Sequence, residues 1–228
     1  MIPDLEKKSA EEILNWALKN FGSKIALASS FQCEESVLID MLYKIAGKNF
    51  RVFTLDTGRL NEETYEVMER IREKYSITIE SQFPDREAVE NLEREKGLYS
   101  FRESVENRKE CCHIRKVVPL NRALAGLDAW ITGLRAEQSV MRAATPKIQE
   151  DVPRKGIVKF NPLVDWTTAQ VWDYIKVNQV PYNQLHDRGY PSIGCAPCTR
   201  AVKEGESIRS GRWWWEDPEH KECGLHLK

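Results

Sequence analysis

The chain has 228 residues, enough to bury one sizeable hydrophobic core. Its 34 basic and 35 acidic side chains leave a formal charge of −1, so the chain lacks the excess of positive charge that is typical of proteins that bind duplex nucleic acid. The amino terminus lacks a basic region followed by an apolar one, and no apolar stretch is long enough to cross a bilayer, so we expect a cytoplasmic protein without a membrane segment. Six cysteines in that reducing compartment favour metal binding or thiol chemistry over disulfides.

The chain opens with a predicted helix, strand and helix. Ser9 begins a capping box, and the spacing of the apolar residues after it predicts a helix over 10–20. A short apolar run at 24–28 predicts a strand, and the polar loop Ser29–Phe31 separates it from a second helical pattern. Amides and hydroxyls at such a helix N-terminus can bind a phosphate or sulfate, although serines that only cap the helix are an equally good interpretation.

The alternation of strands and helices continues. Residues 51–55 and 77–79 predict two strands, with a helix over 62–75 between them, and a charged helix is predicted over 85–96. This order predicts a parallel sheet covered on both faces, with ligands bound beyond the carboxyl ends of the strands. The segment Asp56–Gly58 lies at such an end, as does the loop after the first strand.

Two pairs of cysteines carry the strongest chemical signal. Cys111 and Cys112 are adjacent, and a disulfide between neighbours needs a distorted peptide bond. Cys195 and Cys198 have the spacing that directs two sulfurs at one metal centre. Zinc is one interpretation, but consecutive side chains diverge and suit two irons of a larger cluster, so we predict a [4Fe–4S] cluster on the four thiols. Lys116 follows the double cysteine by one helical turn and would lie on the ligand face.

The second half of the chain adds further elements of the same kind. The double cysteine is predicted to open a helix that continues to Leu127, and the strand 128–132 runs directly into a loop with Arg135. An arginine there can fork two hydrogen bonds onto a phosphate or sulfate, although a surface ion pair is the commoner role. A strand over 156–160 follows, and Thr167 is predicted to cap the next helix.

The motifs occur together, in order, along nearly the whole chain. They are Ser29-Ser30-Phe31, Leu55-Asp56-Thr57-Gly58, the segment from Gly133 to Ser139, both cysteine pairs, the segment from Gly211 to Glu216, and the segment from Glu222 to His226. Over residues 23–226 the chain resembles the bacterial iron–sulfur branch of the adenylyl-sulfate and phosphoadenylyl-sulfate reductase family. The resemblance implies an adenine nucleotide α-hydrolase fold close to the ATP pyrophosphatases, with a mostly parallel twisted sheet and helices on both faces. It also implies a [4Fe–4S] cluster on the same four cysteines.

The resemblance implies a division of the chain and a set of site residues. A nucleotide-binding domain over 1–202 precedes a tail over 203–228, and the polar composition of the tail favours mobility. The catalytic group would be Cys223, with Lys116 between cluster and substrate and His226 favouring the thiolate. The residues implied in substrate binding are Ser29, Ser30, Phe31, Leu55, Asp56, Thr57, Gly58, Arg135, Gln138, Arg209 and Arg212.

The implied reaction is the reduction of adenylyl sulfate to sulfite and AMP in assimilatory sulfate reduction. Cys223 would attack the sulfur and expel AMP, leaving an S-sulfocysteine that reduced thioredoxin removes. The reductant is expected to be a separate protein because the chain ends soon after Cys223. Thiol chemistry accounts for both electrons, so we expect the cluster to act electrostatically and structurally.

Three alternatives stay open. A reductase of phosphoadenylyl sulfate, or one that uses both nucleotides, is the nearest, and the double cysteine favours adenylyl sulfate. An ATP pyrophosphatase would share the fold but usually carries a Ser-Gly-Gly-x-Asp-Ser loop, and a non-enzymatic iron–sulfur sensor leaves Cys223 without a role. Gln32 and Cys33 stand where the family often has small residues, and we expect Cys33 to be an inert buried thiol. A homo-oligomer is compatible with the sequence.

Overall fold

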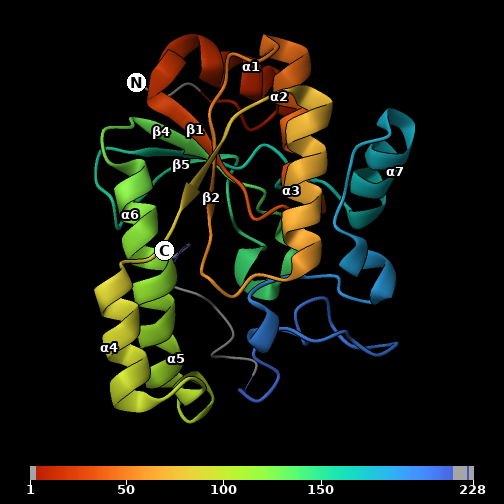
Figure 1. Ribbon diagram of the computed structural model, residues 1–228. Coiled ribbons are helices and arrows are strands. Elements are labelled where there is room, and N and C mark those ends of the chain that lie inside the picture. The colour runs from red at the N-terminus through yellow and green to blue at the C-terminus, as the bar shows by residue number, and fades with distance from the viewer. Residues whose placement is uncertain (1–3, 218–224, 226–228) are drawn as a thin grey trace. The chain divides into compact units, whose positions relative to one another are not determined.

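The computed structural model describes residues 4–217 and residue 225 (Figure 1). The chain divides into two compact units, each assembled from several segments. The first unit comprises 1–54, 62–80 and 126–184, and the second comprises 55–61, 81–125 and 185–228. The expected division into 1–202 and 203–228 stays a prediction.

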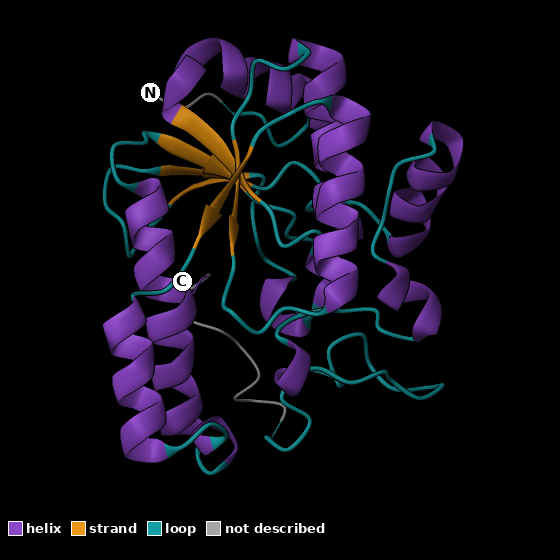
Figure 2. Ribbon diagram, viewed as in Figure 1, coloured by secondary structure: helices purple, strands orange, loops and turns teal. Residues whose placement is uncertain are grey.

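A six-stranded sheet carries the first unit, and its strands form one twisted fan (Figure 2). The strand order is β3-β2-β1-β4-β6-β5. The pairs β1–β2, β1–β4 and β4–β6 are parallel, and β5 runs antiparallel to β6. The mostly parallel sheet is therefore confirmed, while β5 was not predicted. The strands are β1 (Ile25–Ala28), β2 (Val52–Leu55), β3 (Ile79–Gln82), β4 (Ala129–Ile131), β5 (Ile148–Glu150) and β6 (Val158–Phe160).

Among the described residues, four α-helices belong to the first unit, and α2 packs against the other three. Both predicted caps are present: the Ser9 Oγ accepts a hydrogen bond from the Glu12 N–H, and the Thr167 side chain caps α7 in the same way. The central strands β1 and β4 are almost fully buried, as expected for parallel strands covered by helices. The helices are α1 (Ala10–Phe21), α2 (Cys33–Ala46), α3 (Glu62–Tyr75) and α7 (Thr168–Asn178).

The second unit is built on α4 (Arg86–Lys96), α5 (Val105–Cys112) and α6 (Val118–Leu124). Lys96 of α4 forms an ion pair with Glu110 of α5, and the two helices lie side by side (Figure 1). A π-helical turn over His113–Val117 joins α5 to α6, because the Val118 N–H bonds the carbonyl five residues back.

The prediction that the double cysteine opens a helix is wrong. Helix α5 begins at Val105, where the Ser104 Oγ accepts a hydrogen bond from the Asn107 N–H, so Cys111 and Cys112 lie in its last turn. The first turns of α5 are polar and lack apolar periodicity, which is why the pattern missed them.

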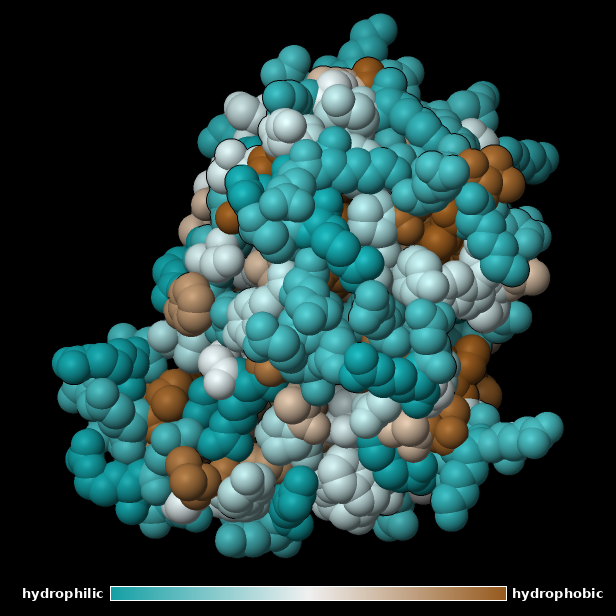
Figure 3. Space-filling model, turned by 45° about the vertical axis from the view of Figure 1, so that its right-hand side comes forward, coloured by the Kyte–Doolittle hydropathy of each residue, from teal (hydrophilic) through white to brown (hydrophobic). Residues whose placement is uncertain are grey.

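Hydrophilic residues cover most of the face drawn in Figure 3, and the hydrophobic ones on it form separate small groups. No helix among the described residues is long and apolar enough to span a membrane.

Candidate active site

In the loop after β1, donors of the loop are hydrogen-bonded to the Glu35 carboxylate. Phe31 has a positive φ of 55°, and its N–H donates to the Ser29 Oγ at 3.2 Å. The Glu35 Oε2 accepts from the Ser30 hydroxyl at 3.0 Å and from the Gln32 N–H at 3.2 Å. Two of the donors expected to hold an anionic group are thus held by Glu35.

Two buried carboxylates at the start of α2 differ in protonation. Burial and the charge of Glu34 raise the pKa of Glu35 to about 7. Burial is the largest single influence and acts to raise the pKa of Glu34, but the Arg135 guanidinium and the hydrogen bonds to the carboxylate together hold that pKa below its ordinary value. Glu34 is therefore the ionised member of the pair, and Glu35 is the one that takes up a proton near neutral pH.

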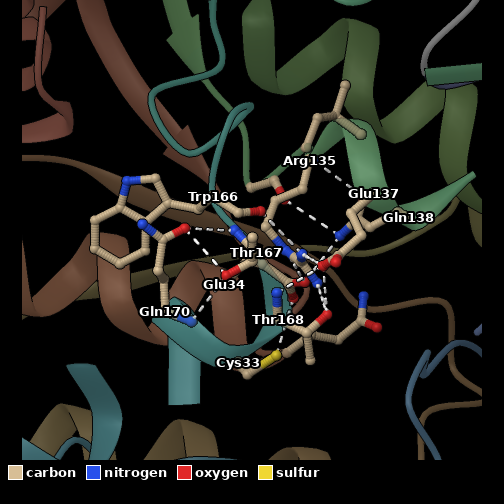
Figure 4. Close-up of polar contacts among 12 residues, drawn as sticks. Cys33, Glu34, Arg135, Glu137, Gln138, Trp166, Thr167, Thr168 and Gln170 are labelled. Carbon is tan, nitrogen blue, oxygen red and sulfur yellow. Dashed lines mark hydrogen bonds and ion pairs between the residues drawn. The ribbon is translucent and has the colours of Figure 1, made fainter. Parts of the chain in front are cut away.

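Arg135 lies at the centre of a polar cluster in the first unit (Figure 4). Its side chain is 3% exposed, and its Nε donates to the Glu34 Oε1 at 2.9 Å. Its Nη1 donates to the Glu137 Oε2 at 2.8 Å and to the Trp166 carbonyl at 3.1 Å, and its Nη2 donates to the Thr168 Oγ1 at 3.2 Å. These partners hold the guanidinium inside the protein.

Gln138 belongs to the same cluster. Its Nε2 donates to the Glu34 Oε1 at 2.9 Å, and its Oε1 accepts from the backbone N–H of Arg135 at 3.2 Å. The structure thus brings Arg135 and Gln138 together on the carboxylate at the start of α2. Because β1 and β4 are parallel neighbours, the loops that carry Ser29 and Arg135 leave the same edge of the sheet. Direct binding of substrate by these residues stays a prediction.

In the second unit the four predicted ligand cysteines line one pocket. Cys111 and Cys112 come from the end of α5, and Cys195 and Cys198 flank a short 3₁₀ turn. The remaining lining residues are mostly basic or aromatic: Arg59, Phe101, Arg108, Arg115, Lys116, Pro197 and Trp213. No set of three or more His, Cys, Asp or Glu side chains in the described part of the chain forms a group that could hold a metal ion.

The four thiols do not share one electrostatic environment. Burial acts to raise the pKa of Cys195, but the nearby basic side chains, of which Lys116 has the largest effect, and a contact of 3.2 Å with the Thr57 Oγ1 together lower that pKa. Burial and the neighbouring Cys195 raise the pKa of Cys198 to about 12. Lys116 lines the same pocket, and its charge favours the thiolate form that binds metals.

The loop after β2 is hydrogen-bonded to two segments that line the thiol pocket. The carbonyl of Thr57 accepts from the Arg115 Nη1 at 2.7 Å, and the Ala196 N–H donates to the Arg59 carbonyl at 2.8 Å. The Asp56 Oδ1 accepts from the Gly58 N–H at 2.9 Å and shapes the turn. Sequence reasoning missed Arg59 and Arg115, although one directly follows the Leu55–Gly58 motif and the other follows Cys112 by three residues.

Trp213 packs beside the thiols and holds the neighbouring part of the chain there. Its side chain is fully buried, and its backbone N–H donates to the Cys198 carbonyl at 3.0 Å. The guanidinium groups of Arg108 and Arg212 lie 4.7 and 4.9 Å from its ring. Arg108 also forms two hydrogen bonds with the Glu216 carboxylate, at 2.9 and 2.7 Å. Residues 212–216 are therefore anchored.

The pocket also holds buried donors. The Trp213 Nε1 and the Arg115 Nε are buried and have no hydrogen-bond partner among the described residues. Such N–H groups beside four thiols suit the sulfides of an iron–sulfur cluster, which accept hydrogen bonds. The residue types that line the pocket therefore suit the predicted group, and its binding by these four cysteines stays a prediction.

The other predicted site residues are placed as follows. Arg212 is buried and its Nη1 donates to the Ser192 Oγ and the Ile193 carbonyl. Arg209 is half-buried, and its carbonyl accepts from the Arg212 N–H. Cys223 and His226 lie outside the described residues.

Comparison with known proteins gives a family. The model of the phosphoadenosine phosphosulfate reductase domain matches residues 24–201. The chain belongs to this family. Its relatives include an adenosine 5′-phosphosulfate reductase of Burkholderia cepacia, 53% identical over 90% of this chain and 81% of the relative. Another of the same name, from Allochromatium vinosum, is 49% identical over 96% of this chain and 85% of the relative. Family membership confirms the predicted enzyme class, an oxidoreductase acting on a sulfur group.

Solved structures support the same fold. A phosphoadenylyl-sulfate reductase from Candida auris, in a phosphate complex, superimposes with a TM-score of 0.73 and 29% identity, covering 89% of this chain and 98% of that chain. An FMN adenylyltransferase from Candida glabrata has a TM-score of 0.58 at 15% identity, covering 94% of this chain and 72% of that chain. The second likeness shows the fold alone, and the predicted adenine nucleotide α-hydrolase architecture is confirmed.

Proposed function

We propose that this family member reduces adenylyl sulfate to sulfite and AMP in assimilatory sulfate reduction, with reduced thioredoxin as the electron donor. The observation that carries the proposal is the pocket of four thiols beside Lys116, in a chain whose relatives are named adenosine 5′-phosphosulfate reductases. The protein would act in the cytoplasm, which keeps such thiols reduced.

The four cysteines would hold a [4Fe–4S] cluster. Cys111, Cys112, Cys195 and Cys198 supply the thiolates, and the buried N–H of Trp213 supplies a donor toward the group. When bound, the cluster would supply a buried charged centre that organises the pocket. The reducing equivalents come from thiols, so no electron needs to pass through it.

The substrate brings a charge problem that basic side chains can solve. Adenylyl sulfate is a polyanion, so an approaching thiolate is repelled unless cations offset the charge. Lys116, Arg209 and Arg212 belong to the second unit and are proposed for this task. Ser29, Ser30 and Phe31 would hold the phosphate end, and the residues proposed to contact the adenosine are Leu55, Asp56, Thr57 and Gly58.

The proposed chemistry has two thiol steps. The Cys223 thiolate, favoured by His226, attacks the sulfur of the sulfate group; the bond from that sulfur to the bridging oxygen breaks, and AMP leaves. A thiolate of thioredoxin then attacks the Cys223 sulfur of the S-sulfocysteine and releases sulfite. The second thioredoxin thiol resolves the mixed disulfide, so the two electrons come from one dithiol.

Arg135 and Gln138 are proposed to act on the substrate through Glu34. Their hydrogen bonds to this carboxylate fix the first turn of α2 and hence the loop before it. A positioning role explains why the Arg135 side chain is only 3% exposed.

Turnover assays test the proposal. Sulfite and AMP should form in equal amounts from adenylyl sulfate and reduced thioredoxin, and the Cys223→Ser variant should form neither, while Cys33→Ser keeps wild-type activity. Parallel assays with the 3′-phosphorylated nucleotide test the nearest alternative. If the enzyme turned over that nucleotide faster, it, and not adenylyl sulfate, would be the substrate. Binding of either nucleotide without turnover would favour an iron–sulfur sensor.

Metal analysis tests the cluster. Purified protein should contain iron and acid-labile sulfide in equal amounts, at the stoichiometry of a [4Fe–4S] cluster. Cys195→Ser should lose iron, whereas Cys33→Ser should keep it. Zinc without sulfide in the wild-type protein would contradict the assignment.

A further inference from the structure

An exposed aromatic surface lies beside the thiol pocket in the second unit. Leu98 is 57% exposed, Tyr99 is 58% exposed and Trp214 is 37% exposed. Large apolar side chains are costly to leave in water, and groups of them on a surface mark interaction sites. We call Leu98, Tyr99, Arg102 and Trp214 the aromatic platform.

Arg102 holds the platform together. Its guanidinium carbon lies 5.2 Å from the ring centre of Tyr99 and 5.4 Å from those of Trp214 and Trp215. Its Nη2 donates to the Pro197 carbonyl at 3.0 Å, between the two cysteines of the second pair. The platform is therefore fixed to the loop that carries Cys195 and Cys198.

The platform rests on the packed aromatic residues around the thiols. The ring centres of Tyr99 and Phe101 are 5.8 Å apart, those of Phe101 and Trp215 are 5.9 Å apart, and those of Trp214 and Trp215 are 4.7 Å apart. Aromatic pairs of this kind are rigid and lose little entropy when a partner covers them. Preformed rigid side chains are what a short-lived protein contact needs.

Leu225 links this surface to the proposed nucleophile. It packs, together with Trp215, against the buried cluster of Phe101, Trp213 and the thiols. Cys223 precedes Leu225 by two residues, and chain geometry limits their Cα separation to about 7 Å. A protein that reacts with the Cys223 thiol must therefore approach the surface that carries Leu225.

We propose that the aromatic platform is the docking surface for the protein reductant. This rests on the proposed function, because the reductant must attack the Cys223 sulfur of the S-sulfocysteine, release sulfite and form a mixed disulfide. The partner that fits is a small dithiol protein with an apolar surface around its exposed thiols. Tyrosine, tryptophan and arginine are the residues that most often dominate the binding energy of such interfaces.

Two half-reactions separate docking from chemistry. The first is formation of the Cys223 adduct from adenylyl sulfate without reductant. The second is removal of that adduct, measured once with a purified bacterial thioredoxin kept reduced and once with dithiothreitol. A small dithiol needs no docking surface, so it reports on the accessibility of the adduct itself.

We expect Tyr99→Ala and Trp214→Ala each to lower the second-order rate constant with thioredoxin about tenfold, the effect of a truncated interface side chain that dominates binding. Adduct formation and removal by dithiothreitol should stay at wild-type rates. Val177→Ala is the matched control, because Val177 is an exposed apolar residue of the first unit, 81% exposed.

Three outcomes would overturn the docking proposal. The first is wild-type thioredoxin rates in both variants, and the second is an equal loss with dithiothreitol, which would place the platform in the chemistry. The third is a change in oligomeric state, which would make the platform a contact between copies of this chain. Absence of the adduct in the wild-type protein would instead refute the proposed function, so the two failures are distinct.

Discussion

Replacing Arg135 by methionine tests whether this residue stabilises the fold or binds substrate directly. The Arg135 and Glu34 side chains are 3% and 5% exposed and are joined at 2.9 Å. The variant leaves the Glu34 carboxylate buried without its counter-ion, and removing one partner of a buried pair costs about 3–5 kcal/mol. Urea unfolding followed by circular dichroism should show that loss in the free energy of unfolding.

Matched variants define the result. Glu34→Gln combined with Arg135→Met should recover much of the stability, because no buried charge is then left unpaired. Arg51→Met is the control, since its pair with Glu80 has the same 2.9 Å separation but is 40% and 35% exposed, so we expect a loss below about 1 kcal/mol. If Arg135→Met unfolded like the wild type but bound adenylyl sulfate far more weakly, the argument from burial would be refuted.

Three further predictions concern the same unit. Burial raises the pKa of Glu35 from 4.5 to about 7, so the contribution of this side chain to stability is lost as pH rises through that range. The free energy of unfolding of Glu35→Gln should therefore match that of the wild type near pH 4 and exceed it by about 3 kcal/mol above pH 7. A difference in urea unfolding that does not depend on pH would contradict this. A Cβ at Gly133 would lie 2.4 Å from the Glu35 Oε1, so Gly133→Ala should cost about 1–3 kcal/mol by thermal unfolding, and an unchanged melting temperature would count against it. Burial and Glu34 raise the pKa of Cys33 well above its ordinary value, so this thiol should resist alkylation in the folded protein; rapid labelling would show the assignment to be wrong.

Local signals predicted much of the fold. The capping boxes at Ser9 and Thr167 each begin a helix as expected, and the predicted bounds of 62–75 match α3. These features depend on neighbours in sequence, so the pattern contains them. Strand β3 begins at Ile79, two residues after the predicted start, since a short apolar run does not define where pairing begins.

Tertiary features could not be predicted. Strand β5 is short and half-buried, and its antiparallel pairing with β6 depends on a distant segment. The contact of Thr57 with Cys195 joins residues far apart in sequence, and no local pattern encodes it. Arg135 was expected to face an anion, but sequence alone does not show that Glu34 lies within hydrogen-bond distance. Sequence patterns single out the residue types, whereas their hydrogen-bond partners are seen only in the structure.

The most direct test of the account is an anaerobic incubation of cluster-loaded protein with adenylyl sulfate, or with its 3′-phosphorylated form, in the absence of thioredoxin, followed by peptide mass mapping. We predict a sulfonate adduct on Cys223 with adenylyl sulfate, removed with release of sulfite when reduced thioredoxin is added. No adduct with either nucleotide would contradict the reductase mechanism.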